Sequence, residues 1–320
     1  MVVGKRLEGP RNSSLYSIVK MRNVAILIFD QVETLDFTGP YEVFDKTCQI
    51  CKDDEDLPPP PFNVFTVAES FAPIRSGTHL CIVPNYTFYD MPSLCYDRDI
   101  LIIPGGIGSR TILSTKPHVL QWIQEQASHV EYVLSVCTGS LLLAKAGLLN
   151  HFDFVTTHSN SLSYLKQLLQ ESITNTTNGN GNDENDDGTN NKMTKIPRVV
   201  NNRRYIDASL PRQQQQPQGV EEEQEREQQG HQVAVGRADH HKTPHPKIVM
   251  SGGITAGIDM CLYMIQKLCG NAILSKVLLR MEYTWTPDEA AHHDDDNDDN
   301  QTSTVSPTWF ENATKLLEDK

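Results

Sequence analysis

The sequence has no apolar stretch long enough to cross a membrane. A membrane-spanning helix needs about 20 apolar residues, whereas the longest apolar run, Val24–Phe29, has the length of a strand. Residues 1–23 carry five basic side chains but no apolar core of the kind that a secretory signal requires. A mitochondrial presequence is the alternative for this Arg- and Ser-containing segment. We therefore expect no membrane partner.

Cysteine is scarce and odd in number, with seven in 320 residues. Disulfide frameworks are typical of short secreted chains with an even count, so we expect free thiols and a cytoplasmic location. Cys48 and Cys51 have the spacing of a redox or zinc pair, but no second pair accompanies them. They also fall at the end of a predicted helix, where a thiolate is disfavoured. We interpret that pair as incidental.

Clustered positive charge is missing as well. The net charge is −13, and three polar tracts at 175–190, 211–232 and 288–299 carry −4, −3 and −7, which leaves the remainder near neutral. Such a chain offers no basic surface for nucleic acid. Only 37 residues follow Tyr283 and they are acidic, so no fused DNA-binding module is expected.

The apolar pattern is interrupted, and hydrophobic residues make up only 38% of the chain. The pattern predicts a flexible N-terminal segment at 1–22, one folded domain at 23–287 and an acidic tail at 288–320. Inside the domain, low-complexity polar insertions are expected at about 172–195 and about 209–246. These insertions are predicted to be disordered, because such compositions bury too little apolar area to offset the entropy of ordering.

Short apolar runs alternate with helix-like segments through the folded part. The runs cover 24–29, 62–68, 99–103, 131–136, 154–157 and 247–250. Strands that are buried on both faces and alternate with helices form parallel sheets covered by helices. We therefore predict an α/β three-layer sandwich with a mostly parallel sheet, and a ligand site at the carboxyl ends of its strands. One helix is expected to begin near Pro40, with Thr38 as a candidate cap.

One segment predicts a reactive cysteine. The apolar run 131–136 ends at Cys137-Thr138-Gly139 and a helical pattern follows at once, which is the strand–turn–helix of a nucleophile elbow. The turn would lift Cys137 off the sheet, and the start of a helix would favour its thiolate and lower its pKa. A buried core cysteine is the alternative.

Two further loops are predicted at the same edge of the sheet. Gly105 and Gly106 follow a strand, and their amides are candidates to bind a developing negative charge, with a plain tight turn as the alternative. The loop 35–40 presents Asp36 beside apolar residues, where loss of water would raise its pKa toward proton-transfer use. A helix-entry cap is the alternative role for Asp36.

Five segments in this order resemble the DJ-1/PfpI superfamily, and within it they are most similar to the isocyanide hydratase branch. They are 36–44, 103–107, 135–140, 156–158 and 251–259. The resemblance implies a flavodoxin-like fold of the class I glutamine amidotransferase type, usually homodimeric. It also implies a small-molecule substrate and no metal or organic cofactor.

On this resemblance, Cys137 matches the nucleophile and Asp36 its acidic partner. Thr138 stands where the peptidases of the superfamily often have His, which disfavours proteolysis. Members similar to the cofactor-free glyoxalases usually have Glu at the position of Asp36, which again favours the hydratase branch. His158 matches a Thr-Thr-His segment of that branch, where a structural role is at least as well supported as a catalytic one.

The activity implied by the resemblance is the hydration of isocyanides to N-substituted formamides. Cys137 would attack the terminal carbon, Asp36 would deliver a proton to give a thioimidate, and water would release the formamide. The amides of Gly105, Gly106 and Thr138 would orient polar atoms of the substrate. Two alternatives stay open: a cofactor-independent glyoxalase or deglycase acting on small reactive aldehydes, and a non-enzymatic redox sensor that oxidises Cys137.

Overall fold

The structure is a computed structural model that describes residues 21–178, 196–201, 203–210 and 245–287. Nearly all of the predicted N-terminal segment (1–22) and the whole predicted tail (288–320) lie outside the described residues. The same holds for most of the two predicted insertions.

A seven-stranded sheet in the order β10-β11-β7-β6-β1-β2-β5 forms the centre of the molecule. Neighbouring strands are parallel throughout, except that β10 runs antiparallel to β11. The predicted mostly parallel sheet is therefore confirmed. The strands are β1 (Arg22–Leu27), β2 (Phe62–Ala68), β5 (Tyr86–Thr87), β6 (Ile100–Ile103), β7 (Tyr132–Val136), β10 (Tyr205–Asp207) and β11 (Lys247–Ser251).

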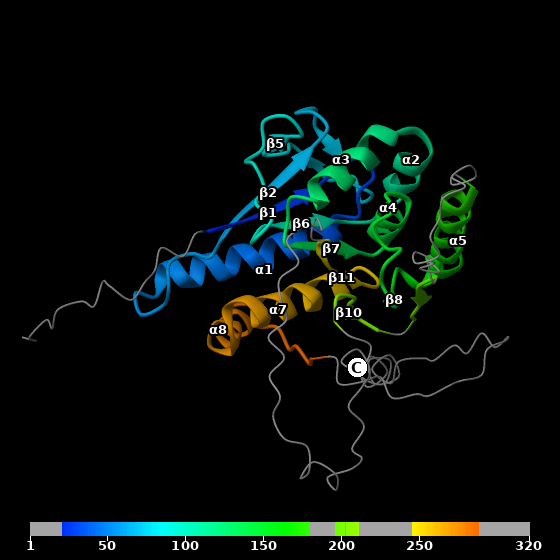
Figure 1. Ribbon diagram of the computed structural model, residues 1–320. Helices are drawn as coiled ribbons and strands as arrows, with labels where there is room; N and C mark the ends of the chain where they lie inside the picture. The colour runs from blue at the N-terminus through cyan, green and yellow to red at the C-terminus, as the bar shows by residue number, and fades with distance from the viewer. Residues whose placement is uncertain (1–20, 179–195, 202, 211–244, 288–320) are drawn as a thin grey trace, which may run out of the picture.

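Helices cover both faces of the sheet, which completes the predicted three-layer sandwich (Figure 1). One layer holds α1 (Thr34–Asp53), α7 (Ala256–Cys269) and α8 (Asn271–Met281). The other holds α2 (Gly108–Thr115), α3 (Pro117–Ala127), α4 (Gly139–Lys145) and α5 (Leu162–Asn178).

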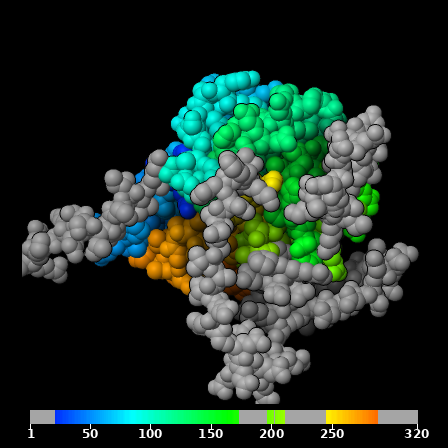
Figure 2. All heavy atoms as spheres, in the orientation of Figure 1, coloured from blue at the N-terminus to red at the C-terminus, as the bar shows by residue number. Residues whose placement is uncertain are grey.

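The apolar strand runs are continuous because both faces of each strand are buried. In β1, Val24 and Ile26 pack toward the α1 layer, whereas Ala25 and Leu27 pack toward the α2 layer. Figure 2 shows the coloured residues as one closely packed body, with orange α7 and α8 beside blue α1. Among the helices of the described ranges, none has the length and hydropathy needed to cross a membrane.

Smaller elements lie outside the main sheet. The strands β3 (Ile74–Arg75) and β4 (Cys81–Ile82) form an antiparallel hairpin, and β8 (Phe154–Val155) pairs with β9 (Arg198–Val199). The run 154–157, expected as a further strand of the central sheet, thus belongs to a separate two-stranded sheet. Helix α5 continues to Asn178, into the first segment that was predicted as an insertion.

Helix α1 begins earlier than the sequence indicated. It starts at Thr34 after the N-cap residue Glu33, so Pro40 lies inside the helix and Thr38 does not cap it. The hydroxyl of Thr38 instead donates to the carbonyl of Thr34 at 2.8 Å. The early start buries Asp36, and the Pro40 ring, which has no N–H, leaves the carbonyl of Asp36 without its usual helical donor. The predicted loop 35–40 is therefore helical.

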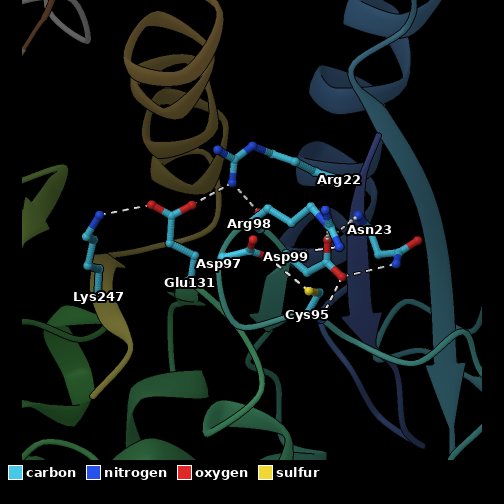
Figure 3. A network of polar contacts seen from close by, with 8 residues as sticks. All are labelled: Arg22, Asn23, Cys95, Asp97, Arg98, Asp99, Glu131 and Lys247. Carbon is cyan, nitrogen blue, oxygen red and sulfur yellow. Dashed lines mark hydrogen bonds and ion pairs between the residues drawn. The ribbon is translucent and has the colours of Figure 1, made fainter. Parts of the chain in front are cut away.

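Polar contacts join the amino ends of four adjacent strands, at the edge opposite the carboxyl ends (Figure 3). Asp99, before β6, is fully buried and accepts from the amide of Asn23 in β1 at 2.9 Å. Glu131, before β7, accepts from Arg22 at 2.6 Å and from Lys247 in β11 at 2.9 Å. We call these five residues the amino-end network; it fixes the frame from which the opposite loops extend.

Candidate active site

The predicted strand–turn–helix is present at Cys137, which lies between β7 and α4. Cys137 has φ +58°, a left-handed conformation that costs a non-glycine residue about 1–2 kcal/mol. Its amide donates to the carbonyl of Gly252 at 2.9 Å, beyond the end of β11. The following glycine is required by space, since a Cβ on Gly139 would lie 2.1 Å from the carbonyl oxygen of Ile103.

Two hydroxyl groups stabilise the turn at Cys137 by donating to its backbone carbonyl. Ser140 donates to the carbonyl of Cys137 at 3.0 Å, and Thr157 donates to the same oxygen at 3.2 Å. Sequence analysis did not assign a role to either residue. The signal available for Thr157 was its place in the Thr-Thr-His segment.

Asp36 reaches the elbow from the first turn of α1. Its side chain is fully buried, and one carboxyl oxygen, Oδ2, accepts from the amide of Gly105 at 3.0 Å. The other oxygen, Oδ1, has no hydrogen-bond partner among the described residues. Burial raises the pKa of Asp36 to about 7, against the opposing effects of the Gly105 amide and the Cys137 thiol. The direction agrees with the desolvation expected from the sequence.

Glu33 is a second acid near the elbow, and sequence analysis did not single it out. It is half-buried, and its amide donates to the carbonyl of Gly105 at 2.9 Å. Its negative charge adds to burial in raising the pKa of Asp36. The signal available in the sequence was the spacing: Glu33 stands three residues before Asp36. At the N-terminus of a helix this spacing brings the two side chains close together.

The thiol of Cys137 is protonated at rest, and the expectation of a lowered pKa is wrong. Burial and then the charge of Asp36 raise its pKa to about 12, which outweighs the lowering effect of the Thr138 amide. Only 6% of Cys137 is exposed, so removal from water is the larger influence. A short helix start does not compensate for that loss of water.

The glycine amides have partners within the protein. Gly105 donates to Asp36, and Gly106 donates to Oγ1 of Thr138 at 2.9 Å. Ser109, which is fully buried, donates to the same oxygen at 3.1 Å. In this structure the two amides, expected to bind a substrate atom, instead fix Asp36 and Thr138. The amide of Thr138 faces the Cys137 sulfur.

Gly105 cannot be replaced without displacing the site. A Cβ there would lie 2.5 Å from the amide nitrogen of Thr138 and 3.0 Å from Oδ2 of Asp36. The absent side chain thus allows the acid, the turn and the elbow to meet.

His158 lies to one side and caps a helical turn. Its Nδ1 accepts from the amide of Asn160 at 3.2 Å, at the start of η1 (Ser159–Ser161). Its ring borders Gly253, where a Cβ would lie 3.3 Å from Cδ2 of His158. These contacts give His158 a structural role in the loop that follows β8.

The described part of the chain holds no cluster of three His, Cys, Asp or Glu side chains arranged to bind a metal ion. Cys48 and Cys51 are both buried on α1, and burial raises the pKa of Cys48 to about 11. This environment agrees with the interpretation of the pair as incidental, because a buried protonated thiol is a poor nucleophile and a poor metal ligand.

Comparison with known proteins places these features in context. The family model described as the DJ-1/PfpI family matches residues 22–182. Isonitrile hydratase of Pseudomonas putida is 37% identical over 126 residues, which are 39% of this chain and 48% of the relative. The match thus spans about half the length of that hydratase. An uncharacterized protein of Streptomyces lividans is 29% identical over 126 residues, 39% of this chain and 80% of that relative.

Solved structures agree in fold. A ThiJ/PfpI family protein from Pseudomonas syringae has a TM-score of 0.54 at 19% identity, and the alignment covers 98% of this chain and 94% of that one. At this identity the likeness extends to the fold alone.

Proposed function

Because the chain belongs to the DJ-1/PfpI family, we propose that it hydrates isonitriles (isocyanides) to N-substituted formamides, with Cys137 as nucleophile and Asp36 as proton carrier. The observation that carries this proposal is the meeting of the two side chains: each alters the pKa of the other. The 37% identity to an isonitrile hydratase supports the choice of substrate class.

The first step transfers one proton in two stages. As sulfur bonds to the terminal carbon of the isonitrile, the Asp36 carboxylate accepts the proton of the Cys137 thiol. Asp36 then gives that proton to the same carbon, which yields a thioimidate, R–N=CH–S–Cys137. A carboxyl group with a pKa of about 7 suits both stages, since it accepts and releases a proton near neutral pH.

The second step adds water and breaks the carbon–sulfur bond. Asp36 takes a proton from water as the water oxygen attacks the thioimidate carbon, and Asp36 then passes this proton to the nitrogen. Collapse of this intermediate expels the Cys137 sulfur, which regains its proton, and releases R–NH–CHO. One water is consumed and no electron is transferred, so the reaction needs no oxidant or reductant. Asp36 thus acts first as a base and then as an acid in each of the two steps.

Two exposed isoleucines favour an apolar substituent on the substrate. Strand β7, which immediately precedes Cys137, lies between β6 and β11. The loops after these two neighbours carry Ile107, 72% exposed, and Ile254, 38% exposed. Apolar side chains on both sides of the nucleophile suit an alkyl or aryl group better than a charged one.

The test is the conversion of cyclohexyl isocyanide to N-cyclohexylformamide, followed by NMR. We expect turnover by the native chain, none by Cys137→Ala, and a rate reduced by about 100-fold or more in Asp36→Asn, since the proton carrier is lost. Cys81→Ala, at an exposed cysteine, is the matched control and should retain full activity. Methylglyoxal is assayed in parallel. Full activity of Cys137→Ala, or turnover of methylglyoxal alone, would contradict the proposal.

A further inference from the structure

A cavity of about 100 Å³ lies away from Cys137, at the carboxyl ends of β1 and β2. Its apolar wall comes from the ends of these two strands, the β3 strand, α2 and α3. The buried apolar residues that line it are Leu27, Ile28, Ala68, Ile74, Ile112 and Val119. Phe88 closes one side and is itself held by stacking on Trp122, with ring centroids 4.1 Å apart.

The cavity is separate from the elbow. Neither Asp36 nor Cys137 borders it. Helix α2 contacts both places: Ser109, in its first turn, donates to Thr138 at the elbow, and Ile112, three residues later, lines the cavity. A Cβ on Gly108 would lie 1.9 Å from the carbonyl oxygen of Asp30, which shows how closely this turn is joined to the end of β1.

Charged groups of both signs line the cavity, and two of them form an ion pair. Glu69 accepts from Lys116 at 2.6 Å, and both residues line the cavity. Outside the lining set, His118 also contacts Glu69, at 2.9 Å. Asp30 lines the cavity and accepts from the amide of Arg75 at 3.1 Å. An ion that binds Glu69 or Lys116 would compete with their ion pair, whereas a hydroxyl group can donate to Glu69 and accept from Lys116 without separating them.

We propose that this cavity is a second small-molecule site, which takes a small apolar ligand bearing one uncharged hydrogen-bonding group. The buried aliphatic wall holds the apolar body, and the Glu69–Lys116 pair holds the polar end. We expect a body no larger than about one six-membered ring, because an enclosed core cavity of about 150 Å³ binds benzene and this partly open one has about 100 Å³. The carboxyl edge of a parallel sheet is also where ligands of such folds gather. The site is independent of the isonitrile chemistry.

Phenol and toluene test the site, since they match in shape and differ in the polar group. We expect phenol to bind the native chain in calorimetric titrations and toluene to bind about tenfold more weakly. Ring protons of bound phenol should show NMR contacts to the methyl groups of Ile112 and Val119. This second measurement needs no variant, so it does not depend on the folding of any altered chain.

Variants separate this site from the elbow. Ala72 lines the cavity and is exposed, so Ala72→Leu fills space there without altering the core. It should weaken phenol binding by about tenfold or more. The matched control is Ala272→Leu, at an exposed position of α8. This control and Cys137→Ala should both bind phenol as the native chain does. Absence of phenol binding, unchanged binding by Ala72→Leu, or loss of binding in Cys137→Ala would each overturn the proposal.

Discussion

The Asp36 carboxylate keeps a proton on the Cys137 thiol. Its charge is the largest cause, after burial, of the raised thiol pKa, and the thiol in turn lowers the pKa of Asp36. Both groups are buried, so a proton lost by one is most readily taken by the other rather than by solvent. In the proposed mechanism the thiolate therefore arises by proton transfer to Asp36 during the reaction, and not by ionisation in the resting protein.

Asp36 should make the protein less stable as pH rises. Its pKa is raised from 3.8 to about 7, so between these values the folded chain holds a proton that the unfolded chain has released. The free energy of unfolding must then fall as pH rises through this window. Asp36→Asn has no such proton, so from pH 4 to pH 8 it should gain a few kcal/mol relative to the native chain. Urea unfolding of both chains at the two pH values measures this, and parallel pH profiles would contradict it.

Cys137→Gly should be more stable than Cys137→Ala. At φ +58°, glycine has no steric penalty, whereas alanine retains it, so we expect a difference of about 1 kcal/mol in glycine's favour. Ser140, three residues later in α4, provides the control, because in a regular helix Ser140→Ala should be the more stable of its two variants. Thermal unfolding compares the four chains. Greater stability of alanine at both positions would argue against strain at the elbow.

Gly105→Ala should remove activity by misplacing the acid. The added Cβ meets the Thr138 amide nitrogen at 2.5 Å, which is backbone and cannot rotate away. We expect a loss of stability of about 1–3 kcal/mol and a larger loss of turnover, because the Gly105 amide also holds Asp36. Gly77→Ala, whose nearest contact would be 3.7 Å, should be close to neutral in both measurements. Normal turnover by Gly105→Ala would contradict the claim that Gly105 is needed to position the Asp36 carboxyl group.

Mild peroxide should oxidise Cys81 before Cys137. The thiolate is the form that peroxide attacks, and the raised pKa of Cys137 leaves little of it at neutral pH. Cys81 is exposed, whereas Cys137 is buried. Peptide mass spectrometry over a peroxide series gives the order of oxidation. Selective oxidation of Cys137 would favour the redox-sensor interpretation over catalysis.

Local patterns predicted the frame of this protein well. The strands at 62–68 and 132–136 follow from their largely apolar runs, and the abrupt turn at Cys137 follows from the Thr138-Gly139 pair at the end of the second run. These features depend on residues adjacent in the chain. The run at 154–157 was assigned to the wrong sheet because its partner, β9, is only two residues long and lies more than 40 residues away.

The misjudged features depend on contacts between distant residues. The pKa of Cys137 is raised first by burial under several elements and then by the charge of Asp36, about 100 residues earlier. The start of α1 depends on the bond from the Glu33 amide to the Gly105 carbonyl, and the bonds from the glycine amides to Asp36 and Thr138 also join distant segments. No local pattern contains such pairings.

Because of the amino-end network, the amino and carboxyl ends of the strands should differ in how well they tolerate substitutions. Glu131 is tied to Arg22 and Lys247, and Asp99 to Asn23, so alterations at that edge would disturb four strands together. The opposite edge carries Ile107 and Ile254 on loops whose exposed side chains hold no strand in register. A protein engineer can therefore vary the exposed side chains of Ile107 and Ile254 to seek new substrates, while the glycines of the same loops and the strands keep their geometry.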